Sequence, residues 1–222
     1  MKINNQRSGL ILVLIIIVSS SIILQSCLIK VFKRGVDDGS SKLTKTDSLL
    51  ISTFNQDDLR KTFNYSSQSA IKFQVINARD ILNVCSQTEY LWVVIGASWC
   101  PISNQALTKY TAISKHFEGT QLRFVYISQD FNLKLLQEEL FEADYPYIPY
   151  LLDPKKYGTD EVTKQERFGK ELNITPLVST FKGGGVPNCF ILDKNEMVCY
   201  HSHGNRITQD TIIKYCKVKP IP

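Results

Sequence analysis

One stretch near the middle of the chain constrains the fold more than any other. Leu91–Ser103 reads LWVVIGASWCPIS, an apolar and β-branched run that ends in small residues, a cysteine and a proline. A helical pattern follows, because apolar residues then recur every three or four positions. They are Ala106, Leu107, Tyr110, Ile113 and Phe117. We therefore expect a buried strand, a sharp turn and a helix, with Cys100 at the junction.

The position of Cys100 favours the chemistry of a thiolate. Pro101 suits the first turn of a helix, where the N–H donor that proline lacks is not needed. The same turn offers free N–H groups and the positive end of the helix dipole, and both stabilise a negatively charged sulfur. Cys100 is therefore a candidate nucleophile.

Regular patterns on both sides of this stretch predict alternating strands and helices. Residues 71–75 alternate as in a strand, and Asn77 is placed to cap a helix over 78–85. The apolar run 122–127 predicts another buried strand, and leucines spaced over 133–140 predict another helix. This order implies a βαβ crossover and a sheet with a parallel core.

The C-terminal third contains a second element of interest. Gly183-Gly184-Gly185-Val186-Pro187 leads into the apolar run 188–193, which predicts a strand. A turn, a strand over 197–203 and a helix over 208–216 follow.

Residues 143–182 look inserted between these two regions. Within them, Tyr145–Tyr150 alternates aromatic residues with prolines and should not form an interior strand, since each proline removes a ladder donor. We expect a rigid loop packed on the core; a peptide-binding surface is the alternative.

Both motifs resemble parts of one family. Trp99-Cys100-Pro101-Ile102-Ser103 is similar to the W-C-x-x-C active-site segment of the thioredoxin superfamily, and Val186-Pro187-Asn188 is similar to its cis-proline element. The resemblance covers about residues 70–217. It implies an α/β, thioredoxin-like fold: a central mixed sheet flanked by helices, with an insertion at about 143–182 before the cis-proline strand.

The resemblance also assigns roles to individual residues. In the family, the first cysteine attacks a disulfide and the second resolves the mixed disulfide that forms. Cys100 matches the attacking thiol, with Trp99 and Pro187 beside it, and Ser103 stands in place of the resolving cysteine. Ser103 can donate a hydrogen bond to a thiolate, but an external thiol, an isomerase-type reaction or another cysteine must end the exchange.

Further departures from the family pattern concern proton transfer. Val94 occupies the position where many members have a buried acid, and Tyr126 the position where many have a lysine. The resemblance therefore implies a reduced proton-handling apparatus. A peroxiredoxin is less favoured, because residues 96–98 lack the threonine which that family places before its cysteine.

The remaining cysteines leave several possibilities open. Cys85 lies on the predicted apolar face of a helix, so we expect a core thiol. Cys189 and Cys199 would lie opposite each other if the turn between them has three residues, but not if it has two. Cys199, His201 and His203 alternate along one strand, should share a face, and are the weaker candidates for a copper or zinc site. Otherwise we expect no metal and no cofactor.

The N-terminus resembles a bacterial lipoprotein leader. Lys2 and Arg7 precede the apolar run Leu10–Leu24, as in a secretory signal peptide. Leu24-Gln25-Ser26-Cys27 is similar to a lipobox, which implies cleavage before Cys27 and attachment of acyl chains such as palmitate to it. An uncleaved signal anchor is the alternative. The expected domains are a signal peptide at 1–26, a lipid-anchored flexible tether at 27–48 and a thioredoxin-like domain at 49–222.

Charge and location together suggest the partners. The chain has 26 basic and 21 acidic residues, and Lys2 and Arg7 lie in the leader, so the excess is too small to imply nucleic acid. We expect an envelope protein, anchored to a membrane through lipid and facing the periplasm or exterior. It would exchange thiols with exported proteins that carry cysteines or disulfides, using an external thiol reductant. The alternative is a non-enzymatic protein that binds peptides or partners; a copper-handling protein is less favoured.

Overall fold

The computed structural model describes residues 47–63, 65, 71–158, 160–172 and 185–220. The predicted signal peptide, Cys27 and most of the predicted tether lie outside the described residues, as do Gly183 and Gly184. Within the described ranges, no helix is both long and apolar enough to cross a membrane.

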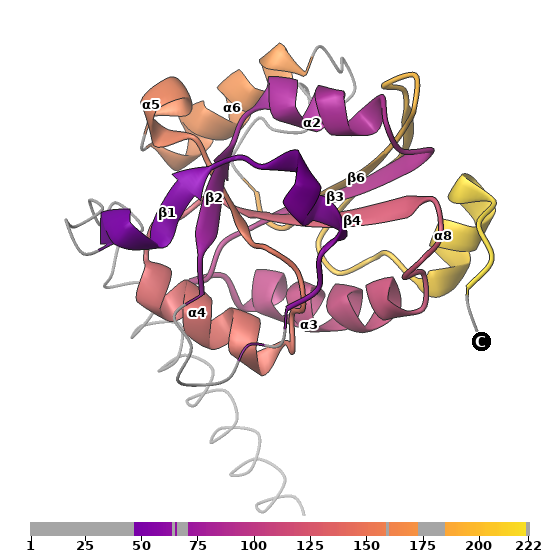
Figure 1. Cartoon of the computed structure of the whole chain (residues 1–222), viewed down its shortest axis with the longest axis horizontal. Helices are drawn as coiled ribbons and strands as arrows, with labels where there is room; N and C mark the ends of the chain where they lie inside the picture. Colours follow the sequence, from indigo (N-terminus) through magenta and orange to yellow (C-terminus); the bar gives the residue numbers. More distant parts are fainter. Residues whose placement is uncertain (1–46, 64, 66–70, 159, 173–184, 221–222) are drawn as a thin grey trace, which may run out of the picture. The chain divides into compact units, whose positions relative to one another are not determined.

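A mixed β-sheet forms the centre of the described domain (Figure 1). Its strands are β1 (Ile51–Thr53), β2 (Phe73–Ile76), β3 (Tyr90–Gly96), β4 (Leu122–Ser128), β5 (Tyr150–Leu152), β6 (Asn188–Asp193) and β7 (Val198–His203). They lie in the order β1-β2-β5-β4-β3-β6-β7. In this spatial order, each strand from β1 through β2, β5 and β4 to β3 is parallel to its neighbour. Strand β6 is antiparallel to both β3 and β7.

Helices cover both faces of this sheet. They are α2 (Ala78–Cys85), α3 (Pro101–Lys115), α4 (Leu133–Glu142), α5 (Pro154–Tyr157), α6 (Glu161–Glu171) and α8 (Gln209–Cys216), with 3-10 turns η1 (Asp47–Leu50) and η2 (Gln56–Arg60). Figure 1 shows α2, α5 and α6 on one face and α3 and α4 on the other. The predicted fold class is therefore confirmed: a central mixed sheet flanked by helices.

Each face of the sheet packs into its own apolar cluster. Successive residues of β3 point to opposite faces, so Trp92 and Val94 join the cluster under α3, α4 and α8. Val93 and Ile95 join the cluster under α2 and α6. All four side chains are fully buried, which accounts for the nearly continuous apolar sequence of this strand.

The insertion supplies a strand that the sequence analysis excluded. Tyr150–Leu152 forms β5 between β2 and β4. The prediction holds for residues 145–149 but is wrong for Tyr150, because the prolines at 146 and 149 remove donors only at their own positions. Pro149 still accepts a hydrogen bond from Gln74 N at 3.2 Å, and the strand begins at the next residue that has an N–H.

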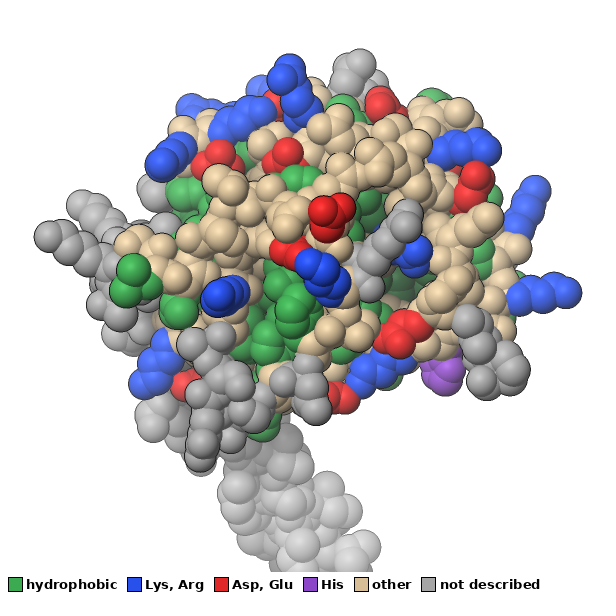
Figure 2. Space-filling view, viewed as in Figure 1, with side chains coloured by type: hydrophobic (Ala, Val, Ile, Leu, Met, Phe, Trp, Pro, Cys, Tyr) green, Lys and Arg blue, Asp and Glu red, His purple; other side chains and the backbone are tan. Residues whose placement is uncertain are grey.

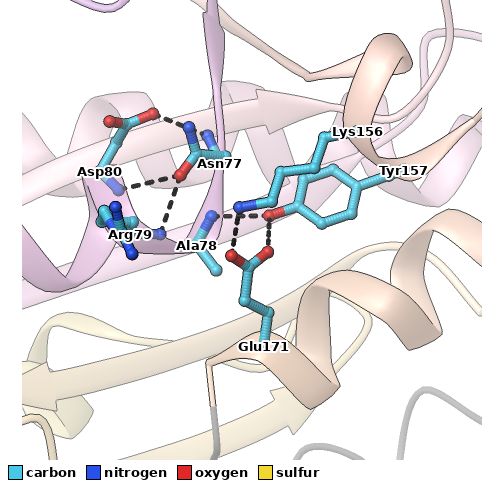
Figure 3. A network of polar contacts seen from close by, with 7 residues as sticks. All are labelled: Asn77, Ala78, Arg79, Asp80, Lys156, Tyr157 and Glu171. Carbon is cyan, nitrogen blue, oxygen red and sulfur yellow. Dashed lines mark hydrogen bonds and ion pairs between the residues drawn. The ribbon is translucent and has the colours of Figure 1, made fainter.

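Polar contacts join the insertion to the start of α2 (Figure 3). The Tyr157 hydroxyl accepts a hydrogen bond from Ala78 N at 2.8 Å and donates one to Glu171 at 2.6 Å. Lys156 pairs with the other oxygen of the same carboxylate. Beside them, the side chain of Asn77 caps α2, as predicted. Both helices of the insertion are thus connected to one point of the core.

We predict that Glu171→Gln destabilises the fold in a pH-dependent way. Burial opposes ionisation of Glu171, but hydrogen bonds from Lys156 and Tyr157 outweigh it and lower the pKa below its ordinary value. A carboxylate with a lowered pKa stabilises the folded state above the unfolded-state pKa, and this contribution is lost as the pH falls through the folded-state pKa. The melting temperature of the variant should therefore be lower at pH 7, and the gap should shrink between about pH 5 and about pH 3.

Thermal unfolding followed by circular dichroism at several pH values measures this gap. Glu138→Gln, which removes an exposed carboxylate on α4, is the matched control and should change little. A gap for Glu171→Gln that stays constant with pH would contradict the prediction.

Candidate active site

Cys100 lies at the junction of β3 and α3, as the sequence predicts. It is the N-cap residue of α3, with extended backbone angles (φ −93°, ψ 113°), and Pro101 is the first helical residue. Its carbonyl accepts the N–H of Asn104 at 3.1 Å, but no side chain caps the helix. The side chain of the N-cap residue thus makes no capping hydrogen bond to the first N–H groups of α3, where Ser, Thr, Asp or Asn would usually supply one.

The cis-proline lies against this cysteine. The Val186–Pro187 peptide bond is cis, and the Cys100 thiol donates a hydrogen bond to the Val186 carbonyl, with 3.6 Å between Sγ and O. The Pro187 carbonyl accepts a hydrogen bond from Gly204 N at 2.9 Å, and Gly204 has φ +72°, a conformation that favours glycine. Two motifs from distant parts of the sequence therefore meet at one site, as predicted. The fold is thioredoxin-like.

The contact with Val186 suits a neutral thiol and opposes a thiolate, because a carbonyl oxygen is only an acceptor. An ionised Cys100 needs donors instead. Ser103 lies one turn further along α3; its side chain is fully buried, and its Oγ has no hydrogen-bond partner within the described residues. Of the apolar residues close to Cys100 in the chain, Trp99 is half-buried and Ile102 is 51% exposed.

A buried carboxylate near the site escaped the sequence analysis. Asp130, just after β4, accepts hydrogen bonds from Ser98 N at 2.6 Å, Ser98 Oγ at 2.9 Å, Ser128 Oγ at 3.0 Å and Asn132 N at 3.2 Å. Asp130 and Ser98 are fully buried. Since Ser98 is two residues before Cys100, these bonds hold the turn that carries the thiol. The available signal was a polar run, 128–130, directly after a buried strand.

The two residues that the resemblance relates to proton transfer are neighbours in the sheet. Val94 and Tyr126 lie opposite each other on β3 and β4, and both are fully buried on the face that α3 covers. An apolar and a phenolic side chain thus occupy the region below the turn.

Residue 103 is a serine, and the other buried cysteines are poorly suited to act as a resolving thiol in its place. Cys189 lies opposite Ser202 and not Cys199, and all five described cysteines are free thiols, so the structure has no bridge across the last hairpin. Burial raises the pKa of Cys189 to about 12, which disfavours its thiolate. Burial likewise raises the pKa of Cys85 and of Cys216 to about 12.

The predicted shared face is confirmed for His201 and His203, whose ring centroids lie 4.9 Å apart, but it is wrong for Cys199. A register shift between β6 and β7, at residues 191–192, leaves Cys199 outside the regular pairing. Its side chain packs against the apolar cluster under α3 and α8, whereas His201 lies opposite Phe190, on the other face. Among the residues with described positions, no group of three candidate ligands could hold a metal ion.

Comparisons with known proteins add resemblances in fold. No family model matches the chain, and no curated protein matches it. A thioredoxin-family thiol:disulfide interchange protein from Chlorobium tepidum TLS is 18% identical, with a TM-score of 0.42 over 58% of this chain and 78% of its own. The thioredoxin domain of a thiol-disulfide oxidoreductase from Bacteroides vulgatus is 14% identical, with a TM-score of 0.42 over 59% and 81%.

A thioredoxin-related protein from Neisseria meningitidis serogroup B is 13% identical, with a TM-score of 0.42 over 59% of this chain and 84% of its own. These similarities are low. The assignment of the fold depends on the strand order and on the cis-proline beside Cys100.

We predict that Asp130→Ala lowers the free energy of unfolding by about 3 kcal/mol or more, since each buried donor left without an acceptor costs about 1–3 kcal/mol. Ser128→Ala removes one of the same hydrogen bonds and should cost about 1 kcal/mol. Urea unfolding followed by tryptophan fluorescence measures both. Equal effects of the two substitutions would show that the carboxylate does not organise this turn.

Proposed function

We propose that the protein carries out thiol–disulfide exchange through the single active-site thiol of Cys100, as a reductase or isomerase of a bacterial cell envelope. One observation carries the proposal: the sulfur lies at the start of α3, 3.6 Å from the carbonyl that precedes the cis-proline. A helix N-terminus favours the thiolate that such a reaction needs.

The reaction balances without a second active-site cysteine. The Cys100 thiolate attacks one sulfur of a substrate disulfide, and the other sulfur leaves as a thiolate and takes up a proton. An external thiol then attacks the Cys100 sulfur and frees the substrate as a thiol. A second external thiol then attacks the disulfide between Cys100 and the first one. Cys100 is released, and the two external thiols leave joined as a disulfide. Where the substrate has another cysteine, that thiol can instead close a new disulfide, which is isomerisation.

Location and partners follow from the N-terminal sequence. The leader, with Leu24-Gln25-Ser26-Cys27 at its end, would be cleaved before Cys27 and replaced by a lipid anchor. The domain would then face the periplasm or the exterior, where disulfides persist. Its partners would be exported proteins with cysteines or disulfides and an external thiol reductant.

The non-enzymatic alternative has less support. Tyr145 and Tyr150 are buried, and the Tyr147 hydroxyl contacts Ser114 and Glu118. The aromatic side chains of this loop therefore pack on the domain instead of forming an open peptide surface. A nucleic-acid partner also stays unexpected: Figure 2 shows Lys and Arg side chains spread over one face with Asp and Glu among them.

We predict that Cys100→Ala abolishes mixed disulfides with envelope proteins. Cells that produce the full-length protein are quenched with acid and alkylated, and adducts are separated without reductant. Wild type should accumulate adducts because Ser103 cannot release them. Cys199→Ala, which removes a half-buried thiol outside the site, should retain them. Adducts that survive in Cys100→Ala, or their absence from wild type, would exclude this function.

We predict that Cys27→Ala releases the protein from membranes or leaves it as an unprocessed precursor. Labelling with an alkyne analogue of palmitate, followed by fractionation, tests this. Wild type should carry label and pellet with membranes, because each buried methylene contributes about 0.8 kcal/mol to anchoring. Label that is retained in Cys27→Ala would exclude the lipobox assignment.

A further inference from the structure

The Tyr126 side chain fits into a notch that Gly96 leaves at the end of β3. A Cβ atom at Gly96 would lie 2.8 Å from two ring carbons of Tyr126, and closer still to its hydroxyl oxygen. Gly96 is the last residue of β3, and the turn to Cys100 starts there. The missing side chain therefore lets a phenolic hydroxyl reach the end of the sheet that carries the thiol.

This hydroxyl is fully buried and has no hydrogen-bond partner in the part of the chain that the structure describes. Two other buried tyrosines satisfy theirs: the Tyr110 hydroxyl donates to Gly204 O at 2.9 Å, and the Tyr157 hydroxyl to Glu171 at 2.6 Å. The Tyr150 hydroxyl, like that of Tyr126, has no partner among the described residues. A buried hydroxyl without a partner costs about 1–3 kcal/mol, and phenylalanine would avoid that cost. The structure thus contains a donor whose acceptor is not among the groups of the resting site.

Of the charged and titratable groups that influence Tyr126, the Cys100 thiol is the one that the proposed reaction ionises. Burial, and then the electrostatic influence of Asp130, Glu139, Cys100 and Cys189, raise the pKa of Tyr126 well above its ordinary value. The phenol therefore remains protonated and keeps its proton available for donation. Asp130 already accepts several hydrogen bonds, and the raised pKa of Cys189 keeps that thiol neutral.

We propose that the Tyr126 hydroxyl is a catalytic hydrogen-bond donor to the Cys100 thiolate, a role that rests on the function proposed above. In the resting state the Cys100 thiol donates to Val186 O. On ionisation that bond is lost, and the sulfur accepts from Tyr126 below and from Ser103 on α3. When the thiolate attacks a disulfide, its negative charge passes to the leaving sulfur, which takes up a proton. The Tyr126 hydroxyl proton is not transferred.

The test compares two substitutions that each remove one buried hydroxyl without a partner. Tyr126→Phe removes the hydroxyl that lies against Gly96, at the end of β3. Tyr150→Phe removes one on the opposite face of the sheet, where Asp58 and Tyr65 influence it and no thiol does. In the full-length protein, alkylation of Cys100 is followed against pH, and mass spectrometry of the Cys100 peptide separates it from the other thiols.

We expect Tyr126→Phe to move the midpoint of this pH profile upward by about one to two units, the effect of losing a hydrogen bond to a charged group. Tyr150→Phe should leave it in place. Gly96→Ala, which displaces the hydroxyl without removing it, should also move the midpoint upward. The melting temperature of Tyr126→Phe should be unchanged or higher, whereas a purely structural hydroxyl would lower it.

An unchanged midpoint in both Tyr126→Phe and Gly96→Ala would overturn this role, and so would an equal shift in Tyr150→Phe. That result is distinguishable from failure of the proposed function. Wild type would still form adducts that depend on Cys100 in the first case, and would form none in the second.

Discussion

The pairing of β3 with β6 is the constraint on which the site depends. Ile95 lies opposite Asn188 at the end of this antiparallel ladder. The turn to Cys100 leaves the sheet just beyond Ile95, and Pro187 immediately precedes Asn188, so the register brings both motifs to the same edge. A slip of one residue would turn every β6 side chain to the other face and expose the apolar cluster under α3. Burial of Cys189 and Ile191 in that cluster therefore fixes the site as well.

Polar groups that this arrangement buries must find partners inside the protein. Asp130 meets the requirement by accepting hydrogen bonds from Ser98, in the turn before Cys100, and from Ser128, the last residue of β4, so it joins the end of β3 to the end of β4. The hydroxyls of Ser103 and Tyr126 do not meet it within the described chain, and the Cys100 thiol contacts an acceptor. Satisfied groups thus hold the turn, while the hydroxyls of Ser103 and Tyr126 would gain an acceptor in the thiolate that we propose.

Much of this could be predicted from the sequence, and the failures share a cause. The strand, turn and helix around Cys100 follow from local periodicity, and the cis-proline from a motif, so both were predicted correctly. The strand β5 has three residues and follows a proline, too short for any period to be visible. The shift that separates Cys199 from His201 depends on how two strands meet. Likewise, the hydrogen bonds of Asp130 join residues from separate elements.

On the proposed function, Ser103 at the place of a second active-site cysteine agrees with the rest of the site. Rapid release of a mixed disulfide by a second thiol of the same protein would need a thiolate near Cys100. Burial raises the pKa of Cys189, the cysteine on β6, and so disfavours its thiolate. The paired residues Val94 and Tyr126 supply no base that could deprotonate a second thiol either. What they supply is a protonated donor. On the function proposed above, such a site would stabilise one thiolate without accelerating its release, and turnover would therefore depend on a thiol that arrives from outside.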